Sequence, residues 1–350
     1  MTVTKNVDLK PKFMSNLLRP NRNLASFSFL VFVSLSSFII SKFLNTTHVI
    51  VEEKFKNYGR SPKYWHVCEA NWNRNGHLRT MDRVFDRLGF EFVNASNGDD
   101  WDVLWGFEYP FDNESAMYDS LFDKPLLQHQ RVNHIPGIFC LTNKMVLTTD
   151  NYDLDFILPT FDYYMESEFH EYVKRNPDSK FVEKSIWNRG VKVVEKDKIQ
   201  FNSSDEMMYQ VFMNEPMLID ERAFDIGVYV LISSVNPIRV YRYKDEMLMR
   251  FCPEPYYPFN ASNVNQYVIY ENHMHYSELP SFKKYDSKYG YSLKRIYEDF
   301  LEEKGYKPDE FWEQIDEIIA TIVSRHDTFL NHQVWMTFTR RSSGFFKILL

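Results

Sequence analysis

Cysteine is scarce in this sequence of 350 residues, which contains three of them. They stand at Cys68, Cys140 and Cys252, and no C-x-x-C pair occurs. Cysteines so few and so far apart do not form the framework of a disulfide-rich domain. We therefore expect all three to be small buried side chains.

The sequence also lacks an excess of positive charge, because its formal net charge is −7 at pH 7. A chain with this charge is not expected to bind nucleic acid through general electrostatic attraction. Tandem repeats and low-complexity tracts are absent as well. The hydrophobic fraction of 44% is typical of globular proteins, and the length allows one large or two modest domains.

The N-terminal region has two parts of different composition. Residues 1–23 are polar and basic, and we expect a disordered tail there. Leu24–Ser41 contains no charged residue and is bounded by Arg22 and Lys42. Extended to residues 24–44, this run just reaches the roughly 17–25 residues that span a bilayer, which favours a single transmembrane anchor. A cleaved signal peptide and a buried core helix are the alternatives.

Hydrophobic spacing predicts the elements that follow. Helical spacing covers 71–89, 293–303 (ending at Gly305) and a segment capped by Asp309. Strand patterns cover 91–93, 103–105, 181–184, 191–194, 228–232 and 238–243, and the last two are expected to pair antiparallel around Asn236-Pro237. Thr160 is predicted to cap a helix in 156–173. We divide the body into an N-terminal α/β subdomain (60–130) and a second region (131–350).

His134 is a candidate ligand or base in the segment Asn133-His134-Ile135-Pro136-Gly137. No second histidine or acid stands at metal-binding spacing from it. A hydrogen-bonded structural histidine is therefore the favoured interpretation.

Residues 209–251 carry a dense motif that resembles the tubulin-tyrosine-ligase-like family, whose domain is an ATP-grasp. The matching residues are Gln210, Pro216, Leu218-Ile219-Asp220, Arg222, Phe224-Asp225-Ile226, Tyr229-Val230-Leu231, Asn236-Pro237-Ile238-Arg239-Val240-Tyr241 and Arg250-Phe251. A second stretch matches at Asn133, His134, Pro136, Gly137, Leu141, Thr142, Lys144 and Leu147. The resemblance spans about residues 64–350 and implies an α+β, ATP-grasp-like fold behind the transmembrane helix.

The resemblance also implies residues that bind the phosphates of ATP. Lys144 and Lys184 would reach the phosphates, Arg250 would contact them, and Gly190 would belong to a loop that covers them. These three cations are the candidate catalytic residues. From the residues alone, a solvated lysine on a helix face is the favoured interpretation of Lys144, and a surface cation is the alternative interpretation of Arg250.

For the nucleoside, the resemblance implies that Gln210 and the backbone of Val211 to Met213 hold the adenine. Asp225 would lie near the ribose. An acid at the end of a strand that forms a local turn is the alternative interpretation of Asp225.

Two departures from the family pattern concern charge. The family reads K-F-D-[LI]-R where this chain has Ala223 and Gly227 at the two cationic positions. The Mg²⁺ ligands of the family are acids that follow a region like Gly344-Phe345-Phe346, where this sequence stops. The resemblance thus predicts a domain that is incomplete at its C-terminus and carries no metal ligands of its own.

The resemblance implies an ATP- and Mg²⁺-dependent ligase that adds a free amino acid to protein carboxylates, with tubulin or microtubules as the partner. An inactive, membrane-anchored pseudo-ligase that binds nucleotide or a protein is the alternative. The basic tail slightly favours a cytosolic N-terminus. Sequons at Asn45, Asn94, Asn113, Asn202 and Asn260 indicate instead a lumenal body with an acceptor other than tubulin.

Overall fold

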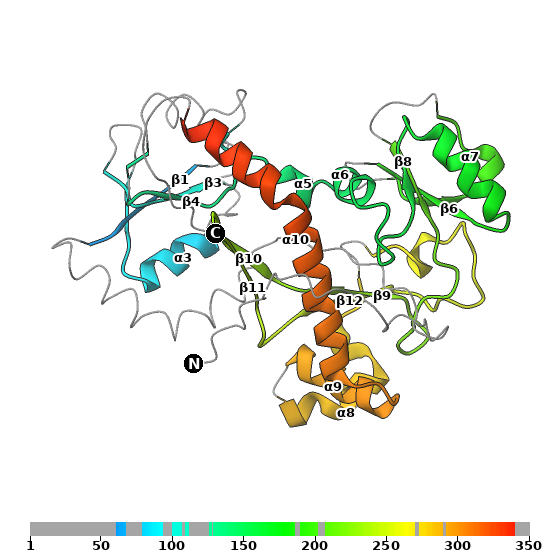
Figure 1. The fold of residues 1–350 in the computed structure, drawn as a ribbon. Helices are drawn as coiled ribbons and strands as arrows, with labels where there is room; N and C mark the ends of the chain where they lie inside the picture. Colours follow the sequence, from blue (N-terminus) through cyan, green and yellow to red (C-terminus); the bar gives the residue numbers. More distant parts are fainter. Residues whose placement is uncertain are drawn as a thin grey trace.

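The fold is given by a computed structural model (Figure 1). It describes residues 61–67, 79–93, 100–106, 109–111, 126–127, 129–185, 190–201, 207–269, 273–289 and 292–339. The predicted tail (1–23), the predicted anchor (24–44) and Cys68 lie outside these residues. Among the residues that are described, no helix is both long and apolar enough to cross a membrane.

The described residues form a mixed structure of helices and strands. The helices are α3 (Arg79–Arg87), α5 (Phe139–Thr142), α6 (Lys144–Thr149), α7 (Glu166–Arg175), α8 (Pro280–Tyr289), α9 (Leu293–Glu303) and α10 (Pro308–Thr339). The strands are β1 (Lys63–Val67), β2 (Glu91–Phe92), β3 (Val103–Gly106), β4 (Arg131–Val132), β5 (Thr160–Phe161), β6 (Phe181–Ser185), β7 (Lys192–Val194), β8 (Met207–Val211), β9 (Phe224–Gly227), β10 (Val230–Val235), β11 (Ile238–Arg242) and β12 (Leu248–Phe251).

The first sheet has the order β2-β1-β3-β4, and all its strand pairs are parallel. Helix α3 buries Met81, Val84 and Phe85 against this sheet, where the ring of Phe85 stacks on Tyr64. The predicted strands at 91–93 and 103–105 are confirmed. The predicted helix at 71–89 is confirmed from Arg79, and residues 71–78 lie outside the described part.

The loop after β4 is tied to the end of β3. The Asn133 side chain accepts a hydrogen bond from the Gly106 amide (2.8 Å) and donates one to the Gly106 carbonyl (2.9 Å). His134 Nε2 lies 3.0 Å from the same carbonyl, which can only accept, so Nε2 carries the proton. His134 is therefore the structural histidine that the sequence predicts. The Gly137 amide donates to the Tyr109 hydroxyl (2.9 Å).

Gly137 is the point where this loop approaches α10. Its φ is +78°, and a Cβ placed on it would lie 2.6 Å from Gln333 Cγ and 3.1 Å from the ring of Phe329. Gly137→Ala is therefore expected to destabilise the protein by about 2–3 kcal/mol, from the left-handed backbone and the collision together. The measurement is urea unfolding.

Gly89→Ala is the matched control for Gly137→Ala. Gly89 has a similar φ of +75° but nothing within 4 Å of its added Cβ. This variant should lose only the backbone contribution of about 1 kcal/mol. Equal losses in the two variants would show that the contact with α10 is unimportant.

The second sheet is antiparallel, with the order β5-β8-β6-β7. One of its faces packs on α7 through Phe161, Phe169 and Phe181. The hairpin predicted from 181–184 and 191–194 is confirmed as β6 and β7. The prediction that Thr160 caps a helix is wrong, because Thr160 lies in β5 and α7 begins only at Glu166.

The remaining strands form two antiparallel pairs, β10-β11 and β12-β9. The predicted turn at Asn236-Pro237 joins β10 to β11 as expected. Helix α9 has the predicted bounds, Leu293–Glu303, and Gly305 follows it with φ +83°. Asp309 lies inside the first turn of α10, which begins at Pro308, so its predicted role as the cap is wrong.

The largest apolar cluster lies where these strand pairs meet α8, α9 and α10. Its fully buried members include Ile219, Phe251, Leu279, Ile296 and Tyr297. Figure 1 shows α10 running through the middle of the molecule, from α8 and α9 at its start toward α5 at its other half. This helix therefore contacts α9, the β10-β11 pair and α5 along its length.

A buried hydrogen bond joins α10 to the residues that follow α6. The Asn151 side chain has no exposed area, and its amide nitrogen lies 2.7 Å from the Leu147 carbonyl and 3.2 Å from His326 Nε2. Because the nitrogen donates to Leu147, His326 Nε2 has to accept and must be unprotonated. Burial lowers the pKa of His326, Arg325 lowers it further, and Asp150 opposes them.

Lowering the pH is expected to destabilise the protein through His326. Since its pKa is lower in the folded state, the unfolded chain binds the proton more readily, and stability falls as the pH drops below about 6.5. His326→Gln should reduce the loss of urea resistance between pH 7.5 and pH 5.5. His170→Gln, at an exposed histidine on α7, is the control. A pH dependence that is unchanged in His326→Gln would contradict this expectation.

Candidate functional site

The candidate site is built from residues on two strand faces. In β6 and β8, Val182 pairs with Gln210, so Val182, Lys184 and Gln210 project from one face of the second sheet. In β9 and β12, Asp225 pairs with Arg250. One apolar cluster contains Val182 and Phe212 from the first of these faces and Ala223 and Cys252 from the second. The two faces therefore pack against each other, and their polar residues point into the same space.

Lys184 is a partly buried cation in this space. Its Nζ donates to Gln210 Oε1 at 2.6 Å. No carboxylate in the described part of the chain forms an ion pair with it. Burial lowers the pKa of Lys184 to about 8, and the charge of Lys144 acts in the same direction. The site thus holds a positive charge that an anionic ligand would stabilise.

Lys144 is brought close to this charge by α6. It is the first residue of the helix, whose start is held by Asn143, since the Asn143 side chain accepts hydrogen bonds from the amides of Met145 and Val146. Burial lowers the pKa of Lys144, and the charge of Arg250 lowers it further. Lys144 is therefore not the solvated helix-face lysine that the residues alone allow. Lys184, Lys144 and Arg250 form a connected cationic cluster.

Arg250 is paired with an acid of the neighbouring strand. Its Nε donates to Asp225 Oδ1 at 3.1 Å, and its second nitrogen makes a short contact with Asp225 Oδ2. The Arg250 side chain is 22% exposed, so the surface-cation interpretation is wrong. Asp225 lies within β9 and does not form a local turn. Asp225 therefore compensates the charge of Arg250.

The segment predicted to hold adenine has most of its backbone donors occupied. The Val211 amide donates to the Pro159 carbonyl (2.9 Å) and the Phe212 amide to the Lys180 carbonyl (2.8 Å). The Met213 carbonyl accepts from the Tyr256 hydroxyl (3.2 Å). The Met213 amide has no partner among the described residues and remains available to a ligand. The roles of Gln210, Val211 and Met213 in adenine binding stay predictions.

The remaining predicted residues border this space. Gly190 has φ +69° and open space around it, which suits a loop, but residues 186–189 lie outside the described part. Gly227 lies on the face of Asp225, so the arginine of the family pattern would point into the site. Ala223 packs in the apolar cluster instead of presenting a cation.

Metal binding can be tested only on the described residues. Among them, no group of three or more His, Cys, Asp or Glu side chains could hold a metal ion. Gly344-Phe345-Phe346 lie outside this part of the chain. The described residues therefore supply no cluster of side chains that could hold Mg²⁺ without the phosphates of a nucleotide.

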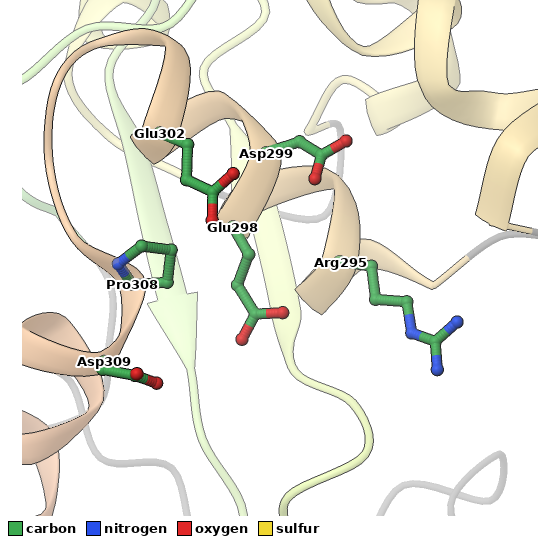
Figure 2. A pocket seen from close by; sticks show the side chains of 6 residues that line it. All are labelled: Arg295, Glu298, Asp299, Glu302, Pro308 and Asp309. Carbon is green, nitrogen blue, oxygen red and sulfur yellow. The ribbon is translucent and has the colours of Figure 1, made fainter.

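A separate pocket lies between α9 and the start of α10 (Figure 2). Its lining is mostly acidic and consists of Arg295, Glu298, Asp299, Glu302, Pro308 and Asp309. Glu298 already accepts hydrogen bonds from Lys294 and from Trp312 Nε1 (2.7 Å). The pocket shares no residue with the cationic cluster and is not part of the candidate site.

Two contributors were missed by the sequence. Asn143 caps the helix of Lys144, and its place just before an apolar helical segment was a usable signal. Thr160 contacts Gln210 across β5 and β8 (Oγ1 to Nε2, 2.8 Å), a contact that depends on the register of distant strands. No local signal in the sequence predicts such a contact.

The fold and the site together are consistent with an ATP-grasp-like α+β domain. Residues 122–348 match the model of the tubulin-tyrosine ligase family. The chain belongs to this family.

Several curated proteins are similar to the chain. The probable tubulin polyglutamylase ttll-15 of Caenorhabditis elegans is 33% identical over 258 residues, which cover 72% of this chain and 49% of that protein. The tubulin polyglutamylase ttll6 of Danio rerio is 26% identical over 297 residues, which cover 77% of this chain and 35% of that protein. The chain thus spans about half or less of the length of these relatives.

Proposed function

We propose that the protein is an ATP-dependent ligase that joins glutamate to carboxylates of tubulin through an amide bond. Membership of the tubulin-tyrosine ligase family supports the type of reaction, and the polyglutamylase names of the relatives support glutamate and tubulin. The observation that carries the proposal is Lys184. A partly buried ammonium group with no carboxylate partner in the described chain, close to a second lysine, fits the phosphates of a nucleotide.

The residues of the chain have distinct tasks in this proposal. Lys184 and Lys144 bind the phosphates and favour the build-up of negative charge on them. Arg250 would leave its ion pair with Asp225 to contact the phosphates. Asp225 would then accept a hydrogen bond from a ribose hydroxyl group. ATP, when bound, supplies the phosphoryl group that activates the acceptor carboxylate.

The test measures binding and transfer separately. Calorimetric titration of the full chain with ATP, with and without Mg²⁺, should show saturable binding. Incubation with tubulin and labelled glutamate should then label tubulin only when ATP is present. Binding of ATP without labelling would reject the ligase but keep the nucleotide site, and the absence of both would reject the whole proposal.

A pseudo-ligase that binds nucleotide without transfer is the second candidate. It is favoured by the two positions where the family has cations and this chain does not, Ala223 and Gly227. Loss of an arginine that faces phosphate removes a contact worth about 1.5–3 kcal/mol. In this alternative, the protein would bind ATP and a protein partner, and labelled glutamate would stay free.

We further propose that Leu24–Ser41 anchors the protein to a membrane as a single-pass helix. The uncharged run between basic residues supports this proposal. The anchored protein should stay with the membrane after alkaline extraction, and a deletion of 24–44 should release it.

The side on which the body lies can be read from Asn260. This asparagine is exposed in an Asn-Ala-Ser sequon, and its Oδ1 accepts from the Ser262 amide (3.0 Å). A glycosidase-sensitive shift that Asn260→Gln abolishes would place the body in the lumen and argue against tubulin as the acceptor. Resistance of all five sequons would favour the cytosol.

A further inference from the structure

A chain of hydrogen bonds leads from the backbone of the second sheet to Lys184. The Thr160 hydroxyl lies 2.9 Å from the Leu158 carbonyl and 2.8 Å from Gln210 Nε2. Gln210 Oε1 in turn lies 2.6 Å from Lys184 Nζ. Thr160 is 1% exposed and Lys184 is partly buried. Water therefore cannot readily take the place of either partner in these hydrogen bonds.

The direction of every bond in this chain is fixed. A carbonyl only accepts, so the one hydrogen of the Thr160 hydroxyl is donated to Leu158. Thr160 can then only accept from Gln210, and the amide nitrogen must face it. An ammonium group only donates, so the amide oxygen must face Lys184. Both ends of the Gln210 amide therefore demand the same orientation.

We propose that Thr160 is a positioning residue of the nucleotide site. It orients the Gln210 amide so that the amide oxygen holds the Lys184 ammonium group between the second sheet and the β9-β12 pair. This inference rests on the proposed function for its link to ATP. The hydrogen-bond chain itself exists without a ligand. Without the acceptor at Thr160, the amide can rotate and turn its nitrogen toward Lys184, where two donors would repel each other.

Thr160→Val keeps the shape of the side chain and removes the acceptor. The ammonium form of Lys184 should then lose its hydrogen bond to Gln210 Oε1, so that the titration midpoint of Lys184 falls by about one pH unit. Affinity for Mg·ATP at pH 7.5 should fall about 10-fold. Thr160→Ser keeps the hydroxyl and should restore both values. Thr328→Val, at an exposed threonine of α10, is the control for a general effect of the substitution.

The midpoint is measured by labelling the full chain with an amine-reactive reagent from pH 6 to pH 10 and quantifying the Lys184 peptide by mass spectrometry. This readout needs no nucleotide. If the wild type fails to bind ATP, the proposed function fails while the midpoint still decides the role of Thr160. A wild-type midpoint in Thr160→Val, or a Thr160→Ser variant as altered as the valine one, would overturn the inference.

Gln210→Leu provides a second variant if Thr160→Val does not fold. It removes the amide that Thr160 is proposed to orient, and it should lower the Lys184 midpoint at least as much as Thr160→Val. A midpoint in Gln210→Leu equal to that of the wild type would also overturn the inference.

Discussion

Replacing Lys184 by methionine is expected to weaken the binding of Mg·ATP by about 10- to 100-fold. The variant keeps the length and most of the volume of the side chain but loses the charge. A charge-assisted hydrogen bond to phosphate is worth about 1.5–3 kcal/mol, and each 1.4 kcal/mol corresponds to a factor of ten in affinity. Calorimetric titration at pH 7.5 measures the change.

Lys174→Met is the matched control, because Lys174 lies on the exposed side of α7 and carries the same charge. The general loss of one positive charge should change the affinity less than about twofold. Equal losses in the two variants would mean that Lys184 does not touch the nucleotide.

The effect of Lys184→Met on stability separates a binding role from a structural one. Burial disfavours the ammonium group, and no carboxylate in the described chain compensates it. Removing the charge should therefore leave the free energy of unfolding unchanged or raise it slightly. Weaker binding of Mg·ATP without a loss of stability would therefore indicate that Lys184 serves ligand binding and not the stability of the fold.

Sequence patterns predicted those parts of the fold that depend on neighbouring residues. Helix α9 has the predicted bounds because its apolar spacing and the glycine after it are both local signals. The hairpin of β10 and β11 was also predicted, since its turn residues stand between two strand patterns. Thr160 was misassigned because a threonine before a helical pattern satisfies the same local rule whether or not a strand intervenes.

The site was predictable as a set of residues but not as an arrangement. Lys144, Lys184 and Arg250 came from the family resemblance, and the structure brings them together. The pairing of Asp225 with Arg250 follows from the register of β9 and β12, strands whose first residues stand 24 positions apart (224 and 248). The bond between Thr160 and Gln210 likewise needs the register of β5 and β8. Such contacts depend on tertiary packing, which local patterns do not encode.

Asp316→Ala is expected to lower the free energy of unfolding by about 3 kcal/mol. Arg242 of β11 is 6% exposed, and its Nε donates to Asp316 Oδ1 of α10 at 2.6 Å while a second nitrogen lies 3.2 Å from Oδ2. The guanidinium carbon also lies 4.5 Å from the centre of the Trp312 ring. Removing the acid leaves a buried guanidinium without its partner, which costs about 3–5 kcal/mol, and the partial exposure of Asp316 favours the lower end.

Two further variants show whether the loss comes from the unpaired charge. Glu317→Ala removes an exposed acid from the next position of α10 and should change the stability by less than about 0.5 kcal/mol. The double variant Arg242→Leu with Asp316→Leu removes both charges and should recover much of the stability that Asp316→Ala loses. The reason is that a buried ion pair stabilises a protein little more than well-packed apolar side chains in the same place. Urea unfolding at pH 7.5 measures all three. If Asp316→Ala were as stable as Glu317→Ala, the contact between β11 and α10 would rest on the apolar cluster alone, with the ion pair adding nothing.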